Sequence, residues 1–294
     1  GAAEAAPEAP PRLDPIFVPV DAPISHLAVG RITKPAFIDF NGDGRPDLVV
    51  GNQLGQLLLF ENLGPAAAPQ WKLVTDRFAG FRQGTNAAPV FVDLHGKGNP
   101  DLVVGTGEGA LFYFENTGKP GHPQFVLRPD ALRGVHVTAN AVPAFASLEP
   151  NGPQLLLGSL RGGLRYYRRS TTTPLDYALV ERQLLSVDLG VNTSPATGDL
   201  TAQHMPFVLV GTDAGPITVL EPTGTSLVRS SGWRVNTAYL AALPMPPGTH
   251  PVLVDLDGDG DPDLVVGTDK GPLLYYRNNA ISPEQTAQGQ DGTP

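Results

Sequence analysis

Two short loops of the sequence carry acidic side chains at a spacing that suits a calcium ion. In each loop, side-chain oxygens stand at positions 1, 3, 5 and 9, and position 7 can offer its backbone carbonyl. Ca²⁺ prefers about six to eight oxygen ligands, and glycines at positions 4 and 6 let the chain curl around an ion. The sequence therefore predicts two metal sites. The first comprises Asp39, Asn41, Asp43, Arg45 and Asp47, and the second comprises Asp255, Asp257, Asp259, Asp261 and Asp263.

A simpler interpretation is that both loops are solvated hairpin turns, because Asp-Gly is a common turn dipeptide. The metal interpretation is favoured because the spacing is the same in two copies, and because closely spaced carboxylates repel one another without a cation. The loops are not EF-hands. Position 12 holds Val50 or Val266 instead of glutamate, and strands rather than helices are expected on both sides.

Both loops belong to a repeat of strand-like segments. Its five copies begin at Pro35, Pro89, Pro143, Pro195 and Pro251. Their second apolar runs end at Gly51, Gly105, Gly158, Gly211 and Gly267, which are 53 to 56 residues apart. Each copy contains an apolar run, a polar loop, a second run typified by Asp-Leu-Val-Val-Gly and an alternating third run. This pattern predicts three strands per copy.

A fourth, weaker run follows the third run in four copies, at residues 71–74, 125–128, 177–180 and 226–229. The last copy lacks this run, but a matching segment begins at Pro15, 20 residues before Pro35. A ring of four-stranded sheets that borrows a strand from the opposite terminus forms a closed β-propeller. We therefore predict an all-β fold, a five-bladed propeller over residues 13–279, with flexible segments at 1–12 and 280–294.

Composition and charge exclude several classes of function. The chain has 294 residues, no cysteine and a formal net charge of −9, so cysteine chemistry is absent and nucleic-acid binding is not expected. No apolar stretch reaches 18 residues, so we expect no membrane-spanning helix. The sequence contains no serine-hydrolase, zinc-protease or P-loop motif. On this ground we expect that the protein is not an enzyme.

The repeat unit resembles the FG-GAP/VCBS repeat of integrin-α-like propellers and bacterial surface proteins, whose loop has the pattern D-x-[DN]-x-D-G-x-x-D. Residues 39–47 and 255–263 match this pattern. The resemblance implies a calcium-dependent propeller in an extracytoplasmic protein that is secreted, periplasmic or at the cell surface. We identify no secretory signal peptide in this chain. The resemblance implies no particular ligand.

The other three copies depart from the metal-binding pattern. The second copy has Asp93, His95, Lys97, Asn99 and Asp101 in its loop, and the ammonium of Lys97 could lie between the two end carboxylates in place of an ion. The third and fourth copies lack the acidic set and carry Ser147, Glu149, Asn151, Gln154, Gly198, Thr201 and Gln203 instead. We therefore expect two Ca²⁺ ions per chain, with a structural role.

Candidate ligand-binding residues are fewer. Asn86, Asn140 and Asn192 recur three residues before a repeat-starting proline, so they are expected near the mouth of the central channel. Their amides could bind a sugar or a peptide, although asparagine at such a position more often only holds a turn. Trp233, in an irregular linker, is the best candidate for an exposed aromatic anchor.

Two classes of function stay open on the sequence alone. The first is a non-catalytic protein-interaction or adhesion module that recognises a protein partner through loops on one face. The second is a lectin that binds glycans at equivalent pockets between blades. A lectin of this kind predicts the same aromatic and polar set in every copy, and no such set is evident.

Overall fold

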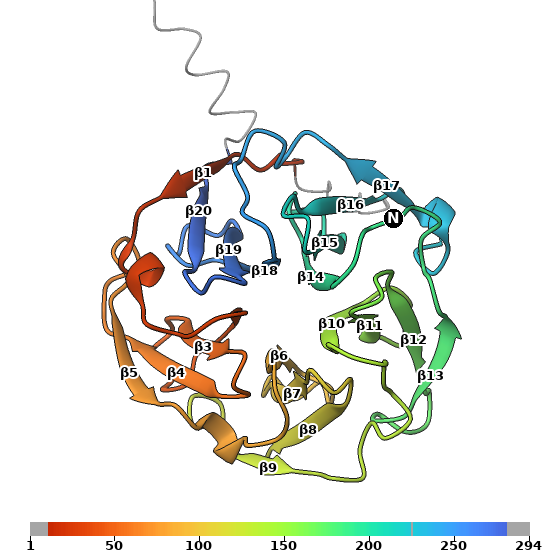
Figure 1. Ribbon diagram of the computed structural model, residues 1–294, viewed down its shortest axis with the longest axis horizontal. Helices are drawn as coiled ribbons and strands as arrows, with labels where there is room; N and C mark the ends of the chain where they lie inside the picture. Colours follow the sequence, from red (N-terminus) through yellow and green to blue (C-terminus); the bar gives the residue numbers. More distant parts are fainter. Residues whose placement is uncertain (1–10, 225, 281–294) are drawn as a thin grey trace, which may run out of the picture.

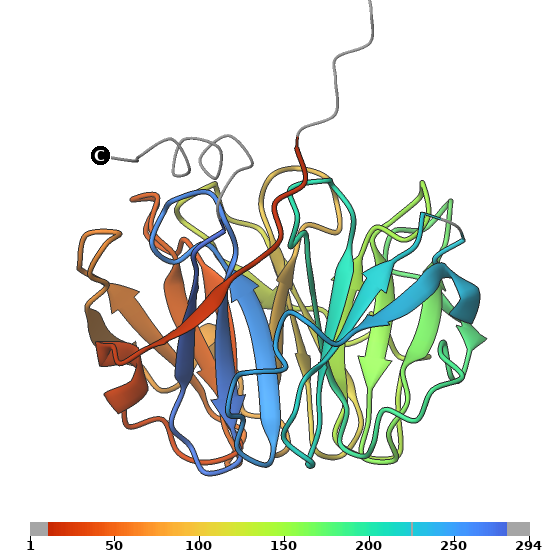
Figure 2. The same cartoon turned by 90° about the horizontal axis from the view of Figure 1, so that it is seen from above.

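The computed structural model describes residues 11–224 and 226–280, and it is a five-bladed β-propeller (Figure 1). Each blade is a four-stranded antiparallel sheet, and the blades form a ring around a central channel. From the side the molecule is a disc with loops on both faces (Figure 2). The described helices are the short 3₁₀ turns η1 (Pro23–His26), η2 (Phe78–Gly80) and η3 (Ser230–Gly232). None of them is long and apolar enough to cross a membrane.

The strands follow one another outward from the channel in each blade. Blade 1 contains β2 (Lys34–Ile38), β3 (Asp47–Gly51), β4 (Leu57–Asn62) and β5 (Trp71–Thr75). Blade 2 contains β6 (Ala88–Val92), β7 (Asp101–Gly105), β8 (Leu111–Asn116) and β9 (Phe125–Leu127). Blade 3 contains β10 (Val142–Ala146), β11 (Gln154–Gly158), β12 (Arg165–Arg169) and β13 (Tyr177–Glu181). Blade 4 contains β14 (Ser194–Gly198), β15 (Phe207–Gly211), β16 (Thr218–Pro222) and β17 (Trp233–Asn236).

Blade 5 confirms the predicted ring closure. It contains β18 (Thr249–Val254), β19 (Asp263–Thr268), β20 (Leu274–Asn278) and, as its outer strand, β1 (Phe17–Val20) from the N-terminal end. Strand β1 pairs antiparallel with β20, with Phe17 opposite Asn278 (Figure 1). The predicted flexible segments lie largely outside the described residues. Arg12, at the end of one of them, donates to Glu221 of blade 4 at 2.9 Å.

The hydrophobic core is divided into five clusters, one between each pair of neighbouring blades. The cluster between blades 3 and 4, for example, joins Leu156 and Tyr166 to Val208 and Leu220. Both faces of each second strand are therefore buried, which explains why these strands read as continuous apolar runs rather than as alternating ones. Each blade is held by its two neighbours.

A close backbone contact joins every blade to the next. A Cβ atom on Gly105 would lie 2.0 Å from the carbonyl oxygen of Ala141 in the next blade, so only glycine fits there. The N–H of Ala141 also donates to the carbonyl of Thr106 at 2.9 Å. The same contact recurs at every interface between blades, and its glycines are Gly51, Gly105, Gly158, Gly211 and Gly267. This explains the regular glycines of the sequence.

The outer strand of blade 4 lies at other residues than the sequence analysis predicted. Residues 226–229, predicted as that strand, form a loop before η3, and β17 begins at Trp233 instead. Trp233 is only 8% exposed, lies in the core cluster between blades 3 and 4, and donates from Nε1 to the carbonyl of Leu227. It is therefore not an exposed anchor. An aromatic residue begins the outer strand of every blade, and these residues are Phe17, Trp71, Phe125, Tyr177 and Trp233.

We predict that Gly105→Ala destabilises the fold by about 3 kcal/mol, because the new methyl group overlaps a backbone oxygen that cannot move without separating two blades. Urea denaturation measures the change. Gly134→Ala is the matched control, since a Cβ there meets nothing within 4 Å, and it is expected to stay within about 1 kcal/mol of the parent protein. Equal stability of the two variants would contradict the interpretation of this contact.

Candidate functional site

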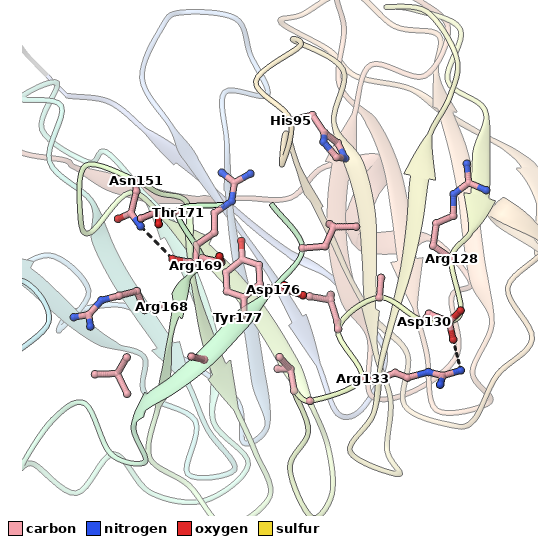
Figure 3. Close-up of a pocket in the computed structure, with 18 of the residues that line it drawn as sticks. His95, Arg128, Asp130, Arg133, Asn151, Arg168, Arg169, Thr171, Asp176 and Tyr177 are labelled. Carbon is pink, nitrogen blue, oxygen red and sulfur yellow. Dashed lines mark hydrogen bonds and ion pairs between the residues drawn. The ribbon is translucent and has the colours of Figure 1, made fainter. Parts of the chain in front are cut away.

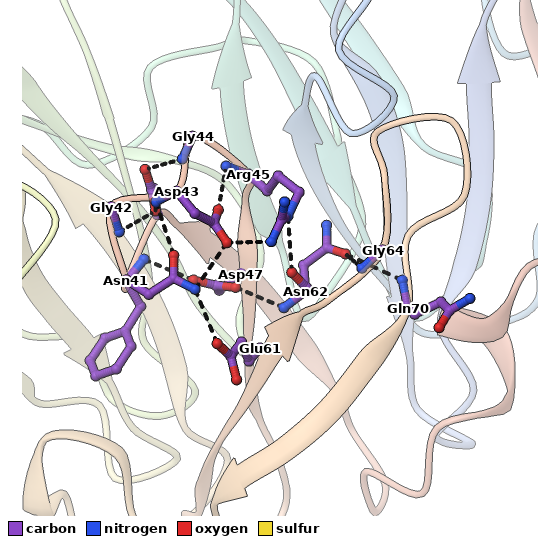
Figure 4. A network of polar contacts seen from close by, with 12 residues as sticks. Asn41, Gly42, Asp43, Gly44, Arg45, Asp47, Glu61, Asn62, Gly64 and Gln70 are labelled. Atoms are coloured by element: carbon purple, nitrogen blue, oxygen red, sulfur yellow. Dashed lines mark hydrogen bonds and ion pairs between the residues drawn. The ribbon is translucent and has the colours of Figure 1, made fainter.

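Residues 39–47 of blade 1 and 255–263 of blade 5, which were predicted to bind metal, are called the metal loops below. The loop of blade 1 is folded around the side chain of Asp39, and Figure 4 shows its residues from Asn41 to Asp47. Oδ1 of Asp39 accepts from the N–H groups of Gly42 and Asp43, and Oδ2 accepts from that of Gly44. Asp47, at the other end of the loop, is fully buried and accepts from the N–H groups of Phe40 and Asn62. The loop therefore holds its end carboxylates in place through backbone hydrogen bonds.

The middle of this loop is less acidic than its counterpart in blade 5. The amide of Asn41 donates to Asp43 at 3.0 Å and to Glu61 at 3.1 Å, and the guanidinium of Arg45 forms an ion pair with Asp43 (Figure 4). Arg45 also donates to the carbonyl of Asn62. The side chain of Arg45 thus provides a counter-charge, while its backbone carbonyl is the atom predicted to bind a metal.

The metal loop of blade 5 brings three carboxylates together. Asp255, Asp257 and Asp263 each offer an oxygen atom within 4.8 Å of the others. Burial raises the pKa of Asp263 to about 6, and burial together with neighbouring carboxylates raises the pKa of Asp257 and Asp261. Burial is the larger cause of each shift, the neighbouring carboxylates add to it, and the guanidinium of Arg277 pairs with Asp257 at 3.1 Å. The all-oxygen donor set fits Ca²⁺, and calcium binding stays a prediction.

The equivalent loops of blades 2 and 3 use protein side chains where a metal would lie. In blade 2, Nε2 of His95 lies 3.1 Å from the Tyr113 hydroxyl and 3.7 Å from the Asp101 carboxylate. The expectation for Lys97 is therefore wrong: it makes no ion pair with any described residue, because the imidazole at position 3 is the group beside the buried carboxylate. In blade 3, Glu149 accepts from Arg168 at 2.8 Å.

The sequence analysis missed the partner of the buried position-9 aspartate. The side-chain oxygen of Asn62 accepts from the N–H groups of Gly64 and Gln70, while its backbone N–H donates to Asp47. The same pairing of an aspartate with an asparagine occurs in blades 2 and 5, and its asparagines are Asn116 and Asn278. The Asn that ends the third run in copies 1, 2 and 5, as in Phe-Glu-Asn, was the available signal.

The predicted asparagines lie at one mouth of the central channel. Asn86, Asn140 and Asn192 have left-handed backbones, with φ between 47° and 52°, which asparagine tolerates better than most residues. Their amides form a chain: Asn86 donates to Asn140, Asn140 to Asn192, and Asn192 to Asp213. Much of their hydrogen-bonding capacity is therefore used within the protein, and they enclose a small pocket of about 50 Å³. Ligand binding by these amides stays a prediction.

The same pocket contains a charged cluster at the seam between blades 5 and 1. Burial lowers the pKa of Lys34 to about 8. Burial, together with the nearby Lys34, lowers the pKa of His250 to about 4. His250 Nε2 lies 3.1 Å from a carboxylate oxygen of Asp269. Below the pocket, the central channel contains a larger cavity with a volume of about 370 Å³. This cavity is lined mainly by the first strands of the blades.

A much larger cleft opens between blades 2 and 3, with a volume of about 1050 Å³ (Figure 3). We call it the blade 2–3 cleft. Its apolar part includes Leu132, Val135 and Leu175. Its charged side chains are Glu115, Arg128, Asp130, Arg133, Arg168, Arg169 and Asp176. The cleft also reaches His95 and Asn151 in the loops that replace the metal loops.

Comparisons with known proteins agree with this architecture. The FG-GAP-like repeat family matches residues 39–104, and the FG-GAP repeat family matches residues 247–282. The crystal structure of a GH43_1 enzyme from Xanthomonas citri has a TM-score of 0.57 at 13% identity, covering 91% of this chain and 92% of that one. The same enzyme complexed with xylotriose gives 0.54 at 13% identity, covering 90% and 91%. No curated protein sequence matches the chain.

A lectin structure, BP39L from Burkholderia pseudomallei, is also similar, with a TM-score of 0.47 at 16% identity, covering 87% of this chain and 71% of that one. The enzyme structures correct one expectation from the sequence. The GH43_1 structures are enzymes with this fold, so the expectation that the chain is not an enzyme is contradicted. The expectation rested on the absence of a few sequence motifs, which does not exclude catalysis by side chains assembled from separate blades. At this low identity the likeness shows the fold alone.

We predict that the channel mouth makes stability dependent on pH. His250 is buried, and Lys34, Asp213 and Asp269 face the same pocket. Because the folded pKa of His250 is about 4 and the ordinary value is 6.5, the unfolded chain binds its proton first as pH falls. The free energy of unfolding should therefore fall by about 3 kcal/mol between pH 6.5 and pH 4 from this group. Urea denaturation of the parent and of His250→Gln tests this, and equal pH slopes would contradict it.

Proposed function

We propose that this FG-GAP repeat β-propeller is a calcium-stabilised interaction module that acts outside the cytoplasm and binds a protein partner in the blade 2–3 cleft. The observation that carries the proposal is the composition of that cleft. It combines an apolar wall with arginine side chains, of which Arg128 and Arg168 are about half exposed and Arg133 is 70% exposed. Arginine next to apolar surface is typical of the residues that dominate protein–protein binding.

The charge of the cleft suggests the chemistry of the partner. Four arginines line it in a chain whose net charge is −9. Their acidic neighbours Glu115 and Asp130 are paired with Arg128 and Arg133 at the rim. An acidic peptide segment can therefore exchange its carboxylates for these exposed pairs at little cost, because exposed ion pairs contribute about 1 kcal/mol or less.

The loss of metal ligands in blades 2 and 3 fits the same proposal. His95 and Asn151, which line the cleft, stand in the loops that in blades 1 and 5 carry the aspartate sets. In a loop that coordinates an ion, the ligand positions must keep oxygen-bearing side chains. In a loop held by His95 or by Glu149 instead, the other side chains are free to contact a partner. The acidic loops would then stabilise one side of the ring, and the substituted loops would serve recognition on the other.

A glycan-binding propeller is the second candidate function. In the form with equivalent pockets between blades, it requires the same lining at each interface. The position of Arg168 is occupied by Glu61, Glu115 and Glu221 in blades 1, 2 and 4, and by an arginine, Arg277, in blade 5. The lining is therefore not the same at each interface between blades, and this favours a single partner.

Calcium binding is tested by native mass spectrometry after exhaustive chelation and titration with CaCl₂. We expect two ions to be regained by the parent, and one by each of Asp39→Asn and Asp255→Asn. Asp93→Asn, at position 1 of the blade 2 loop, is the control and should still regain two. Calcium at tenfold its dissociation constant should stabilise the fold by about 1.4 kcal/mol per site. A parent protein that regains no ion would overturn this part of the proposal.

The cleft is tested with Arg133→Glu, which reverses an exposed charge on its rim, and with Arg82→Glu, an exposed arginine outside the cleft, as the control. A protein captured from the native source by the parent and by Arg82→Glu should be lost, by about tenfold or more, with Arg133→Glu. A glycan array with and without a chelator is run on the same variants. Saturable sugar binding that Arg133→Glu removes would replace the protein partner with a glycan.

A further inference from the structure

Two polar groups at the channel mouth lack a hydrogen-bond partner among the residues that the structure describes. Nδ1 of His250 is fully buried without one, while its other ring nitrogen contacts Asp269. Lys34 is 6% exposed, and its ammonium, which borders the channel, makes no hydrogen bond or ion pair with any described residue. A fully buried acceptor left unpaired costs about 1–3 kcal/mol. Both residues line the mouth pocket and the channel below it, so they lie at the constriction between the two.

The protonation states of these residues define the chemistry that would satisfy them. The contact with His250 lowers the pKa of Asp269, so its carboxylate is ionised at neutral pH and Nε2 of the imidazole must carry the hydrogen between them. Nδ1 is then an acceptor only, and the Lys34 ammonium is a donor only. A hydroxyl group satisfies both, because its oxygen accepts from Lys34 and its hydrogen is donated to His250.

Charged ligands fit this pocket less well. A simple anion has no hydrogen to donate to His250, and it would meet the carboxylates of Asp213 and Asp269 in the same pocket. A metal cation would be repelled by Lys34, and the neutral His250 is the only imidazole among the lining residues. Asp213 and Asp269 can instead accept hydrogen bonds from further hydroxyl groups. The lining is therefore suited to a neutral ligand that carries several hydroxyls.

We propose that the channel mouth binds a neutral polyhydroxylated compound, a sugar or a polyol, by inserting one hydroxyl group between Lys34 and His250. The pocket of about 50 Å³ has room for a hydroxymethyl group but not for a sugar ring. The ring would rest on the outer face, where the loops hydrogen-bonded to Asn86 and Asn192 expose the apolar side chains of Leu54 and Leu160.

This site is independent of the blade 2–3 cleft. Lys34 stands at the first residue of β2, whereas the metal loop follows its last residue, so the two lie at opposite ends of the same strand. The cleft reaches His95 and Asn151, which occupy metal-loop positions in their own blades. No residue lines both the cleft and the mouth pocket. The two proposals can therefore fail separately.

The experiment is an NMR titration of protein labelled with ¹⁵N-histidine, with D-xylose, D-glucose and glycerol as probes. A hydroxyl donated to Nδ1 shifts the ring resonance of His250, and at least one probe should produce a saturable shift. Lys34→Met should weaken that binding about tenfold or more, since a hydrogen bond to a charged group is lost. Lys270→Met removes an exposed lysine next to Asp269 and should leave binding unchanged. Arg133→Glu in the cleft should also leave it unchanged.

Three outcomes would overturn the proposal. The first is the absence of a saturable shift with all three probes, which would mean that water alone fills the pocket. The second is equal binding by Lys34→Met and the parent. The third is a response to sodium acetate that depends on Lys34 while the neutral probes give none, which would mean an anion site. If Lys34→Met does not fold, Lys34→Gln, which also removes the charge and keeps the His250 resonance as the readout, takes its place in the same comparison.

Discussion

The close approach of a glycine to a backbone carbonyl in the next blade is the contact on which the ring depends. At Gly211, for example, a Cβ would lie 2.1 Å from the carbonyl oxygen of Thr249, and the N–H of Thr249 donates to the carbonyl of Thr212. This contact sets the distance between the first strands, and therefore the width of the channel. The repeated prolines belong to the same contact, since the ring of Pro251 also faces Gly211. The apolar clusters between blades fill the remaining space.

Once these contacts hold the ring, the loops at its two faces are free to differ. The metal-loop positions keep their aspartates in blades 1 and 5, but carry His95 in blade 2 and Glu149 in blade 3, each paired within its own blade. At the opposite face, asparagines form a hydrogen-bonded chain over blades 2 to 4, while Lys34 and His250 take the equivalent region at the seam. The glycine and the proline of the contact between blades are thus kept in all five copies while these loops differ.

The sequence predicted the fold well because the glycine contact between blades requires a glycine and a proline at regular intervals in the chain. The period of the glycines gave the blade number, and the 20-residue offset of Pro15 gave the closing strand. The outer strand of blade 4 was missed because an outer strand contacts the core mainly through its first aromatic residue, so Trp233 in an irregular linker looked exposed. The blade 2–3 cleft and the orphan pair of Lys34 and His250 join residues from different blades. A linear sequence contains no signal for such neighbours.

The ring is closed by non-covalent contacts inside blade 5, where β1 from the N-terminal end pairs with β20, and the acidic loop of the same blade lies close to this pairing. Asn278 accepts from the N–H of Ile16 in the closing segment, and its own N–H donates to Asp263, a residue of the blade 5 loop. The carboxylate that would bind the metal is therefore linked to the closing segment by two hydrogen bonds in series through Asn278. An ion in this loop would hold Asp263 ionised and fixed, and so would strengthen the closure itself. This gives a physical reason for the proposed calcium site of blade 5 to lie in the blade that closes the ring.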